Sequence, residues 1–223
     1  MLEMRKVFHS ELKEIENDVI AMGSMVENSL KLSVEALRNR DLVLAERIIA
    51  DDDKVNSKRF DIEERSLFLV ATQQPVGSEL RIIASILNII WELERIADHA
   101  EGIARVTIMI GDEPPLKPLV DIPRMMEKVN NMLRRSLEAF INRDADTARK
   151  ISTEDDEVDN LYDQVFRELL SFMAEDPRII TRATRLIWVV HNLERSGDRV
   201  TNICERVVFV VTGKMEEIGA SKY

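Results

Sequence analysis

The sequence has little of what β-rich proteins need. Among its 223 residues are only seven glycines and six prolines, and aromatic residues make up 5%. Strands and their tight turns draw on these residue types, so their scarcity disfavours a sheet protein. What is abundant is charge, at 32%, beside 45% hydrophobic residues, a mixture typical of long amphipathic helices around a core. The sequence therefore predicts an all-α protein.

Cysteine and long apolar runs are also nearly absent. Cys204 is the single cysteine, which excludes an internal disulfide and a thiolate metal cage and suits a reducing cytosol. The most apolar stretches, 82–91 and 207–212, are interrupted well short of the roughly 18–20 residues that a transmembrane helix needs. The first residues, MLEMRKVFHSELKE, carry no sustained apolar segment of the secretory kind. We expect a cytoplasmic protein.

The formal net charge of −10 argues against one class of partner. The 31 lysines and arginines are spread along the chain and form no single basic stripe. Such a surface repels a phosphate backbone, so we expect no nucleic-acid partner.

The second half of the chain repeats the first. SVEALRNRD at 33–41 matches SLEAFINRD at 136–144, and ADDDKVN at 50–56 matches TEDDEVD at 153–159, both at a shift of 103 residues. Farther on, ELERIADHAEGI at 92–103 matches NLERSGDRVTNI at 192–203 at a shift of 100. Similarity over about 70 residues indicates a duplicated unit, and we expect each unit to build its own core.

Prolines and glycines divide each unit into three helices. We expect helices over 3–39, 42–73, 77–110, 122–142, 145–174 and 177–212. The predicted organisation is a first three-helix bundle at 1–111, a Pro-rich linker at 112–120, a second three-helix bundle at 121–213 and a C-terminal tail at 214–223. Cys204 falls on the apolar seam of the last helix, which indicates a core residue.

Paired acids stand at the same place in the last helix of each unit. Glu94 and Asp98, like Glu194 and Asp198, are four residues apart and share one helix face. Like charges at this spacing cost about 0.2–0.5 kcal/mol unless a cation lies between them. Oxygen ligands of this kind suit Mg²⁺, Mn²⁺, Ca²⁺ or oxidised iron, and zinc also uses carboxylates.

The second helix of each unit adds further oxygen donors. Asp52 and Asp155 lie on apolar seams, and Asn56 and Asp159 follow one turn later. If the second and third helices pack antiparallel, these groups face the acid pairs. The alternative is a solvated face on which Arg95, Arg195 and Arg199 neutralise the acids. His99 and His191 also lie beside the motifs, but their repeat partners are Arg199 and Trp91, so neither belongs to the duplicated pattern.

The segments LERIADHAEGIA, LERSGDRVTNI and QQPVGSELR, with the DDDKVN and EDDEVD segments, resemble the PhoU family of phosphate-transport regulatory proteins over nearly the whole chain. The resemblance implies two tandem three-helix bundles related by pseudo-twofold symmetry, and acidic motifs that hold iron or zinc clusters. The candidate ligands are Asp52, Asn56, Glu94, Asp98, Glu101, Asp155, Asp159, Glu194, Asp198 and Asn202. Asn56 replaces an acid, Gly102 stands where the second unit has Asn202, and Ala97 replaces a glycine that Gly197 retains, so the first unit would bind metal differently. Because the second unit has the fuller acidic set, we expect the second to be the tighter site if only one unit holds metal tightly.

The resemblance also implies a function. It suggests a cytoplasmic regulator of phosphate uptake and of phosphate-starvation signalling. The chain would act as an adaptor between the ATPase subunit of a phosphate ABC transporter and a membrane sensor histidine kinase, peripheral to the membrane through these partners, with a homodimer left open. Two alternatives remain: a metal-free helical adaptor and a carboxylate-bridged metalloenzyme. We expect no enzyme, because the Glu-x-x-His pattern of ferritin-like sites occurs only reversed, from His191 to Glu194.

Overall fold

The computed structural model describes residues 2–218 of the chain, and within them it is helical with no strand. The helices follow the expected order, three to a unit, with one of the six divided in two. Their bounds are α1 Leu2–Asn39, α2 Leu42–Gln73, α3 Ser78–Ile110, α4 Asp121–Asn142, α5 Ala145–Thr153, α6 Asp155–Glu175 and α7 Ile180–Thr212, with a short 3₁₀ turn, η1, at Pro177–Ile179. The all-α prediction is confirmed.

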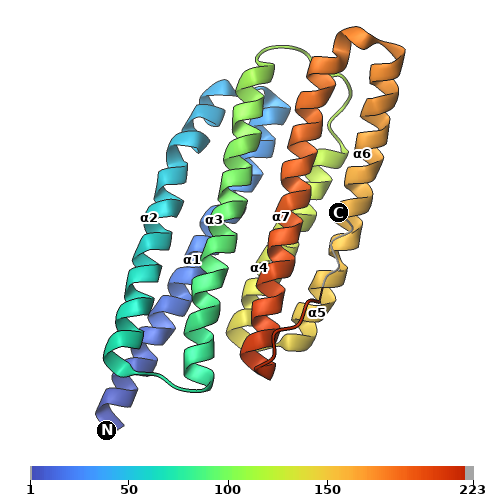
Figure 1. The fold of residues 1–223 in the computed structure, drawn as a ribbon. Helices are drawn as coiled ribbons and strands as arrows, with labels where there is room; N and C mark the ends of the chain where they lie inside the picture. The colour runs from blue at the N-terminus through green and yellow to red at the C-terminus, as the bar shows by residue number, and fades with distance from the viewer. Residues whose placement is uncertain (1, 219–223) are drawn as a thin grey trace.

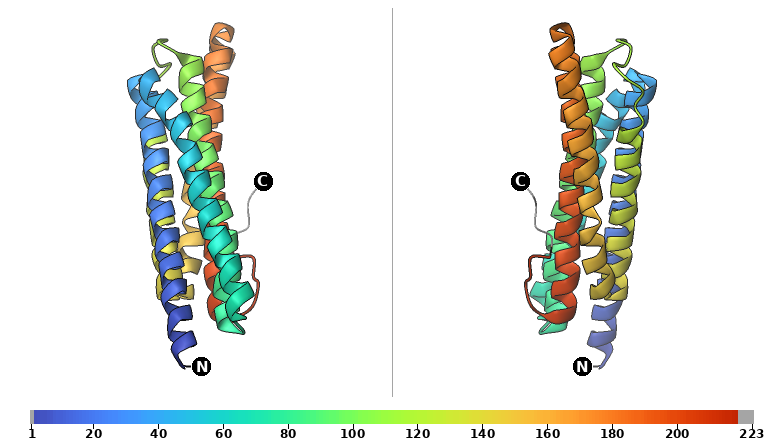
Figure 2. Two further views of the ribbon diagram at one scale, coloured as in Figure 1. Left: turned by 90° about the vertical axis from the view of Figure 1, so that its left-hand side faces the viewer. Right: turned by 90° about the vertical axis from the view of Figure 1, so that its right-hand side faces the viewer.

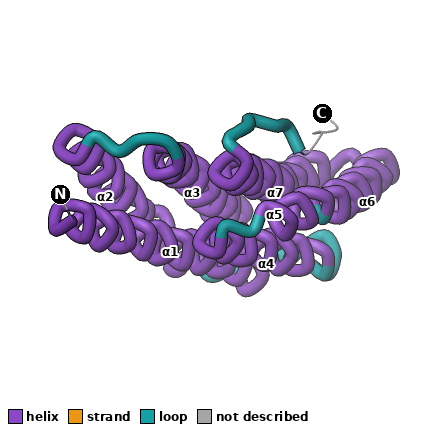
Figure 3. Tube along the Cα trace, turned by 90° about the horizontal axis from the view of Figure 1, so that it is seen from below, coloured by secondary structure: helices purple, strands orange, loops and turns teal. Residues whose placement is uncertain are grey.

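The helices run up and down along one long axis (Figure 1). Seen from one end, α2, α3, α7 and the α5–α6 pair form one layer, and α1 and α4 form the other (Figure 3). The side views in Figure 2 show how thin this two-layered molecule is. Each unit is an antiparallel three-helix bundle, and the two units meet where α3 packs on α7 and α1 packs on α4. Among the described residues, no helix is both long and apolar enough to cross a membrane.

The duplication extends to the helix ends. Asp41 precedes α2, and its carboxylate accepts a hydrogen bond from the Leu44 N–H at 2.9 Å. Asp144 precedes α5 in the second unit and accepts from the Thr147 N–H, also at 2.9 Å. Each cap satisfies a backbone donor that the first helical turn leaves without a partner. Both units therefore start their second helix in the same way.

The expected single helix over 145–174 is wrong in one respect, because the structure divides it at Glu154. The hydroxyls of Ser152 and Thr153 donate to backbone carbonyls three residues earlier, at 2.9 and 2.8 Å. The Glu154 N–H likewise turns to the Ile151 carbonyl, a tighter bond than the α-helical one. The break makes Asp155 the first residue of α6, directly beside α7.

The expectation of two separate cores also needs correction. Buried side chains of both units form one continuous apolar cluster that runs from Phe8 to Val210. The reason is the central pair, because α3 and α7 bury residues on two faces, one toward their own unit and one toward each other. Cys204, on the predicted seam of α7, is buried. In α3 the apolar residues spaced three and four apart are buried as well, namely Ile83, Ile86, Ile90, Leu93, Ala97, Ala100 and Ala104. Burial raises the pKa of the Cys204 thiol to about 12, which keeps it protonated and supports its prediction as a core residue.

Polar contacts cross the junction between the two units. Glu92 of α3 accepts from Arg199 at 3.5 Å and from the Asn202 amide at 3.2 Å, both on α7. A few residues along the same junction, His99 Nδ1 lies 3.1 Å from the Ser196 hydroxyl. These contacts fix the register of α3 against α7.

Candidate functional site

The predicted acids gather into two clusters, one per unit. The first cluster comprises Asp52 of α2 with Glu94, Asp98 and Glu101 of α3, and these α3 acids raise the pKa of Asp52. The second cluster comprises Asp155 and Asp159 of α6 with Glu194 and Asp198 of α7, and the other three raise the pKa of Asp155. The antiparallel packing on which the prediction depended is present in both units.

The second cluster is set deep in the fold by a close approach of α6 to α7. Gly197 is buried, and a Cβ built on it would lie 2.3 Å from Asp155 Oδ1. Only glycine leaves room for the carboxylate at that point. Asp155 Oδ1 is itself buried and has no hydrogen-bond partner among the described residues. A buried carboxylate oxygen without a partner is costly, so its environment calls for a proton or a cation.

The electrostatics of the second cluster favour uptake of positive charge. Burial, then Asp159, Asp198 and Glu194, raise the pKa of Asp155 to about 8. Burial and the neighbouring Asp198 and Asp159 raise the pKa of Glu194 to about 7. These carboxyl groups share a region of low solvent access where the negative charges repel each other. The cluster therefore holds protons near neutral pH in the absence of another cation.

Two rings border the second cluster on its solvent side. His191 Nδ1 lies 3.5 Å from Glu194 Oε2, and the Tyr162 ring lies 6.2 Å from the imidazole, centroid to centroid. Burial, then the Arg195 charge, lowers the pKa of His191, so the imidazole is neutral and can act as a ligand. Glu194 Oε2 lacks a hydrogen-bond partner among the described residues, as Asp155 Oδ1 does.

The first cluster is shallower and partly neutralised. Burial and the acids of α3 raise the pKa of Asp52 to about 6, less than in its counterpart Asp155. The Asn56 amide donates to Asp52 Oδ2 at 2.8 Å, so Asn56 already partners this carboxylate. Asp98 is exposed. Ala97 occupies the position of Gly197, and its methyl group removes the space that admits Asp155 in the second unit.

An arginine to which the sequence pattern assigns no role lies beside the first cluster. Arg59 is buried, with its guanidinium 3.9 Å from the Trp91 ring centroid and 4.2 Å from that of Phe60. Its charge opposes the burial that raises the pKa of Glu94. Tyr162 takes the same repeat position in the second unit. The difference between Arg59 and Tyr162 is visible in the repeat, and it gives the first cluster a buried arginine at a position that carries no charge in the second.

The alternative of salt-bridged acids holds for part of the set. Glu101 is paired with Arg105 at 2.5 Å, and Asp198 with Arg195 at 3.4 Å. Arg199 pairs instead with Glu92 in the junction between the units. Arginines therefore form ion pairs with the outer acids of each cluster, Glu101 and Asp198, whereas Asp155 and Glu194 lie deeper.

Two candidates point into the junction between the units. The Asn202 amide donates to Glu92, so this group helps to pack α7 on α3. His99 contacts Ser196, and its pKa falls to about 4 through burial and nearby arginines. The role of Asn202 as a ligand stays a prediction.

The residues of the second cluster fit a hard metal ion in donor type and in burial. Carboxylate oxygens without partners, a neutral imidazole and a glycine that clears the space are features of such sites. Across residues 2–218, however, no three His, Cys, Asp or Glu side chains already stand together at metal-holding distances. A metal would therefore have to draw the carboxylates inward.

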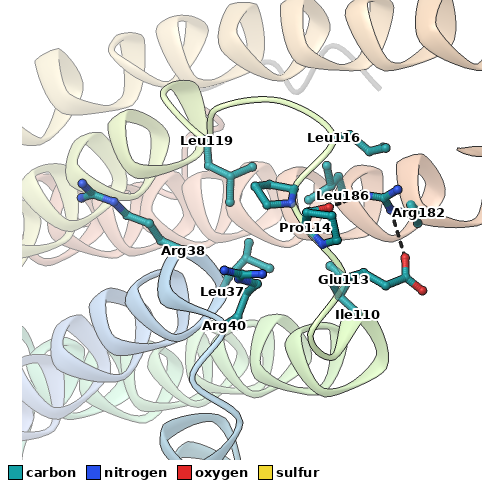
Figure 4. A pocket seen from close by; sticks show the side chains of 11 residues that line it. Leu37, Arg38, Arg40, Ile110, Glu113, Pro114, Leu116, Leu119, Arg182 and Leu186 are labelled. Carbon is teal, nitrogen blue, oxygen red and sulfur yellow. Dashed lines mark hydrogen bonds and ion pairs between the residues drawn. The ribbon is translucent and has the colours of Figure 1, made fainter.

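A separate pocket, with about 380 Å³ of empty space including its open mouth, lies at the end of the molecule where the linker joins the units (Figure 4). Leu37, Leu119 and Leu186 contribute to its apolar wall, and Arg182 pairs with Glu113 across its rim at 3.0 Å. None of the clustered acids lines this pocket. It belongs to the packing of the linker and not to the acidic site.

Comparison with known proteins places the chain. The family model of the PhoU domain matches twice, at 19–107 and 122–207. Phosphate-specific transport system accessory protein PhoU homologues of Clostridium acetobutylicum and Aquifex aeolicus are 38% and 39% identical, covering 96% and 92% of this chain and 98% and 93% of theirs. The crystal structure of PhoU from Pseudomonas aeruginosa superposes with a TM-score of 0.88 at 36% identity, covering 93% of this chain and all of that one. The phosphate transport system regulatory protein PhoU from Streptococcus pneumoniae also gives 0.88, at 30% identity, over 94% and 99% of the two chains. This chain belongs to the PhoU family.

Proposed function

We propose that this protein is a cytoplasmic regulator of phosphate uptake and phosphate-starvation signalling. It acts as a helical adaptor between the ATPase subunit of a phosphate ABC transporter and a membrane sensor histidine kinase, and it reaches the membrane through these partners. The names of its relatives, which are accessory and regulatory proteins of phosphate transport, support the transport role. The rigid two-layered bundle, with long helices exposed on both sides, suits docking of two partners.

We further propose that the adaptor binds metal, iron or zinc above the other candidates Mn²⁺, Mg²⁺ and Ca²⁺. The observation that carries this proposal is the pair of buried oxygens, Asp155 Oδ1 and Glu194 Oε2, which have no hydrogen-bond partner among the described residues. When bound, the ion would neutralise the carboxylates and brace α6 against α7. Asp155, Asp159, Glu194 and Asp198 would hold it in the second unit, and Asp52, Glu94 and Asp98 in the first.

Native co-purification tests the adaptor role. The full chain, tagged and expressed in its own host, should retain the phosphate transporter's ATPase subunit through gentle washing. Repeated failure to retain that subunit, while the protein itself is well folded, would count against the role. The metal-free adaptor differs in one respect only: it predicts that protein purified without chelator holds no stoichiometric metal, as measured by mass spectrometry of the elements.

A further inference from the structure

The α2 helix lies at the edge of its layer and is covered on one side only. Within residues 2–218 it packs against α1 and α3 and against no other element. Figures 1 and 3 show its outer side facing away from the rest of the bundle. An edge helix of this kind ordinarily presents polar side chains to water.

The outer side of α2 instead exposes three large apolar side chains in its second half, beside the acids Asp61 and Glu64. Phe60, Leu67 and Phe68 are 59%, 53% and 64% exposed. Their spacing of seven and eight residues keeps them on one helix face, and Phe60 stays exposed although it stacks on Arg59. We call these three residues the outer face of α2. Large apolar side chains that gather on one face mark interaction sites more often than isolated ones do.

The duplicated unit provides an internal control for this face. Val55, Ile62 and Ser66 of α2 are buried, as are their repeat counterparts in α6, Val158, Val165 and Leu169, so the two helices share one register. In that register the positions of Phe60, Leu67 and Phe68 are taken in α6 by Asp163, Leu170 and Ser171. The same helix in the same bundle is therefore stable with two polar residues there. Folding does not account for the two phenylalanines.

A groove beside the outer face carries negative charge. Its lining residues come from α1 and α2, and it measures about 810 Å³ with its open mouth. Arg65, its only lining cation, is paired with Asp18 and lies 3.3 Å from Glu14. Glu11 and Glu64 have no ion-pair partner within the described residues. The lining residues are Glu11, Glu14, Ile15, Glu64, Arg65 and Phe68.

We propose that the outer face of α2 and this groove form a docking site for a basic amphipathic helix of a partner protein. Apolar side chains of the partner would cover Phe60, Leu67 and Phe68, and its lysines or arginines would pair with Glu11 and Glu64. Charge complementarity selects this occupant, because the acidic groove repels an acidic helix and the anionic surface of a membrane. This proposal rests on the proposed adaptor role only for the identity of the partner, and not for the existence of the docking site.

The test measures binding of a fluorescent peptide to the purified full-length chain by anisotropy. The probe is a leucine–lysine peptide of about 18 residues with all leucines on one helical face. We expect saturable binding that weakens with salt. Leu67→Ser and Phe68→Ser should each weaken it at least about tenfold, and Glu64→Lys should weaken it and reduce the salt dependence. The matched control is Leu170→Ser, at the repeat position of Leu67 and likewise exposed at 45%, which should bind as wild type does.

Absence of saturable binding by the wild type would overturn the proposal, and so would equal losses of affinity in Leu67→Ser and Leu170→Ser, which would indicate non-specific attraction. A wild-type dimer that Phe68→Ser makes monomeric would show that a second copy of the chain covers this face. Tighter binding to vesicles of phosphatidylglycerol than to the peptide would show that the face binds a membrane surface. Circular dichroism of each variant verifies that it is folded, which is expected for exposed positions. Because only the isolated chain and the peptide take part, a negative result here leaves the co-purification test of the adaptor role unaffected.

Discussion

Gly197 of α7 and Asp155 of α6 approach so closely that a Cβ on the glycine would lie 2.3 Å from Asp155 Oδ1. The contact is possible because the helix break at Glu154 brings Asp155 to the first turn of α6. In the first unit α2 is unbroken past Asp52, and Ala97 replaces the glycine. The depth of the second cluster thus depends on two local features, a helix break and an absent methyl group.

Gly197→Ala should therefore destabilise the protein. Alanine normally stabilises a helix interior over glycine by about 0.5–1 kcal/mol, but here its methyl group must displace a buried carboxylate. We expect a net loss of about 1–3 kcal/mol in the free energy of unfolding, measured in urea. The reciprocal change Ala97→Gly is the control and should cost only the propensity difference. A Gly197→Ala variant as stable as wild type would show that Asp155 moves away freely.

The metal-free protein should lose stability as pH rises. The pKa of Asp155 is about 8 in the folded chain against 3.8 for a free aspartate, and that of Glu194 is about 7 against 4.5 for a free glutamate. Between these values the folded chain holds protons that the unfolded chain has released, so the free energy of unfolding falls from about pH 4 to about pH 8. We expect a loss of at least about 1 kcal/mol between pH 5 and pH 8.

Asp155→Asn tests the origin of that slope. The amide cannot ionise, so the variant should keep much more of its stability at pH 8 than the wild type does. Denaturation by urea with chelator present at each pH gives the comparison. If wild type and variant show the same slope, the titrating group lies elsewhere.

The junction between the units should depend on Glu92. Its carboxylate pairs with Arg199 and accepts from Asn202, and the Glu92 and Arg199 side chains are only 19% and 17% exposed. Glu92→Ala leaves a half-buried guanidinium without its counter-charge, and we expect a loss of about 1–3 kcal/mol. The exposed pair Lys31 and Glu35 is the control, where Glu35→Ala should change stability by less than about 0.5 kcal/mol.

A double-mutant cycle isolates this pair. Arg199→Ala in the Glu92→Ala background should cost less than Arg199→Ala alone, because the partner is already gone. Additive losses would mean that the two side chains stabilise the junction independently.

Helix bounds were predictable because the signals are local. Pro75 and Gly77 end α2 and begin α3, and Gly77 adopts a φ of 61° that favours glycine. The proximity of Asp155 to Glu194 and Asp198 was also predictable, from the helical periodicity and the repeat. The break at Glu154 did not, because it depends on hydroxyl to carbonyl bonds that compete with an otherwise good helical pattern.

The shared core escaped prediction for a different reason. Periodicity shows that α3 has an apolar seam but not that its other faces pack on α7, which is a long-range pairing. The same pairing engages Asn202 with Glu92, a contact that spacing along α7 cannot reveal. The sequence also does not reveal how deeply each cluster is buried. Asp52 and Asp155 occupy equivalent positions in the repeat, yet their pKa values are about 6 and about 8.

Metal content should fall unequally when the two clusters are disrupted. Asp198→Ala removes a carboxylate from the deeper cluster, and Asp98→Ala removes its exposed counterpart. Because the second unit has two buried oxygens without hydrogen-bond partners among the described residues, and Tyr162 in place of the buried Arg59, we expect Asp198→Ala to lower bound metal more than Asp98→Ala does. Elemental mass spectrometry of protein purified without chelator measures this, and circular dichroism should show nearly unchanged helix content.

The control for these variants is Asp61→Ala, which removes an exposed acid of α2 outside both clusters and should leave the metal content unchanged.

The pH dependence of metal binding provides a second test. A metal ion must displace the protons that Asp155 and Glu194 hold near neutral pH, so apparent affinity should increase from pH 6 to pH 8 in the wild type. The increase should be smaller in Asp155→Asn, whose amide binds no proton to displace. Metal content that survives both Asp98→Ala and Asp198→Ala would place the ion away from these clusters, and affinity that is flat across this pH range would mean that the raised pKa values do not govern binding.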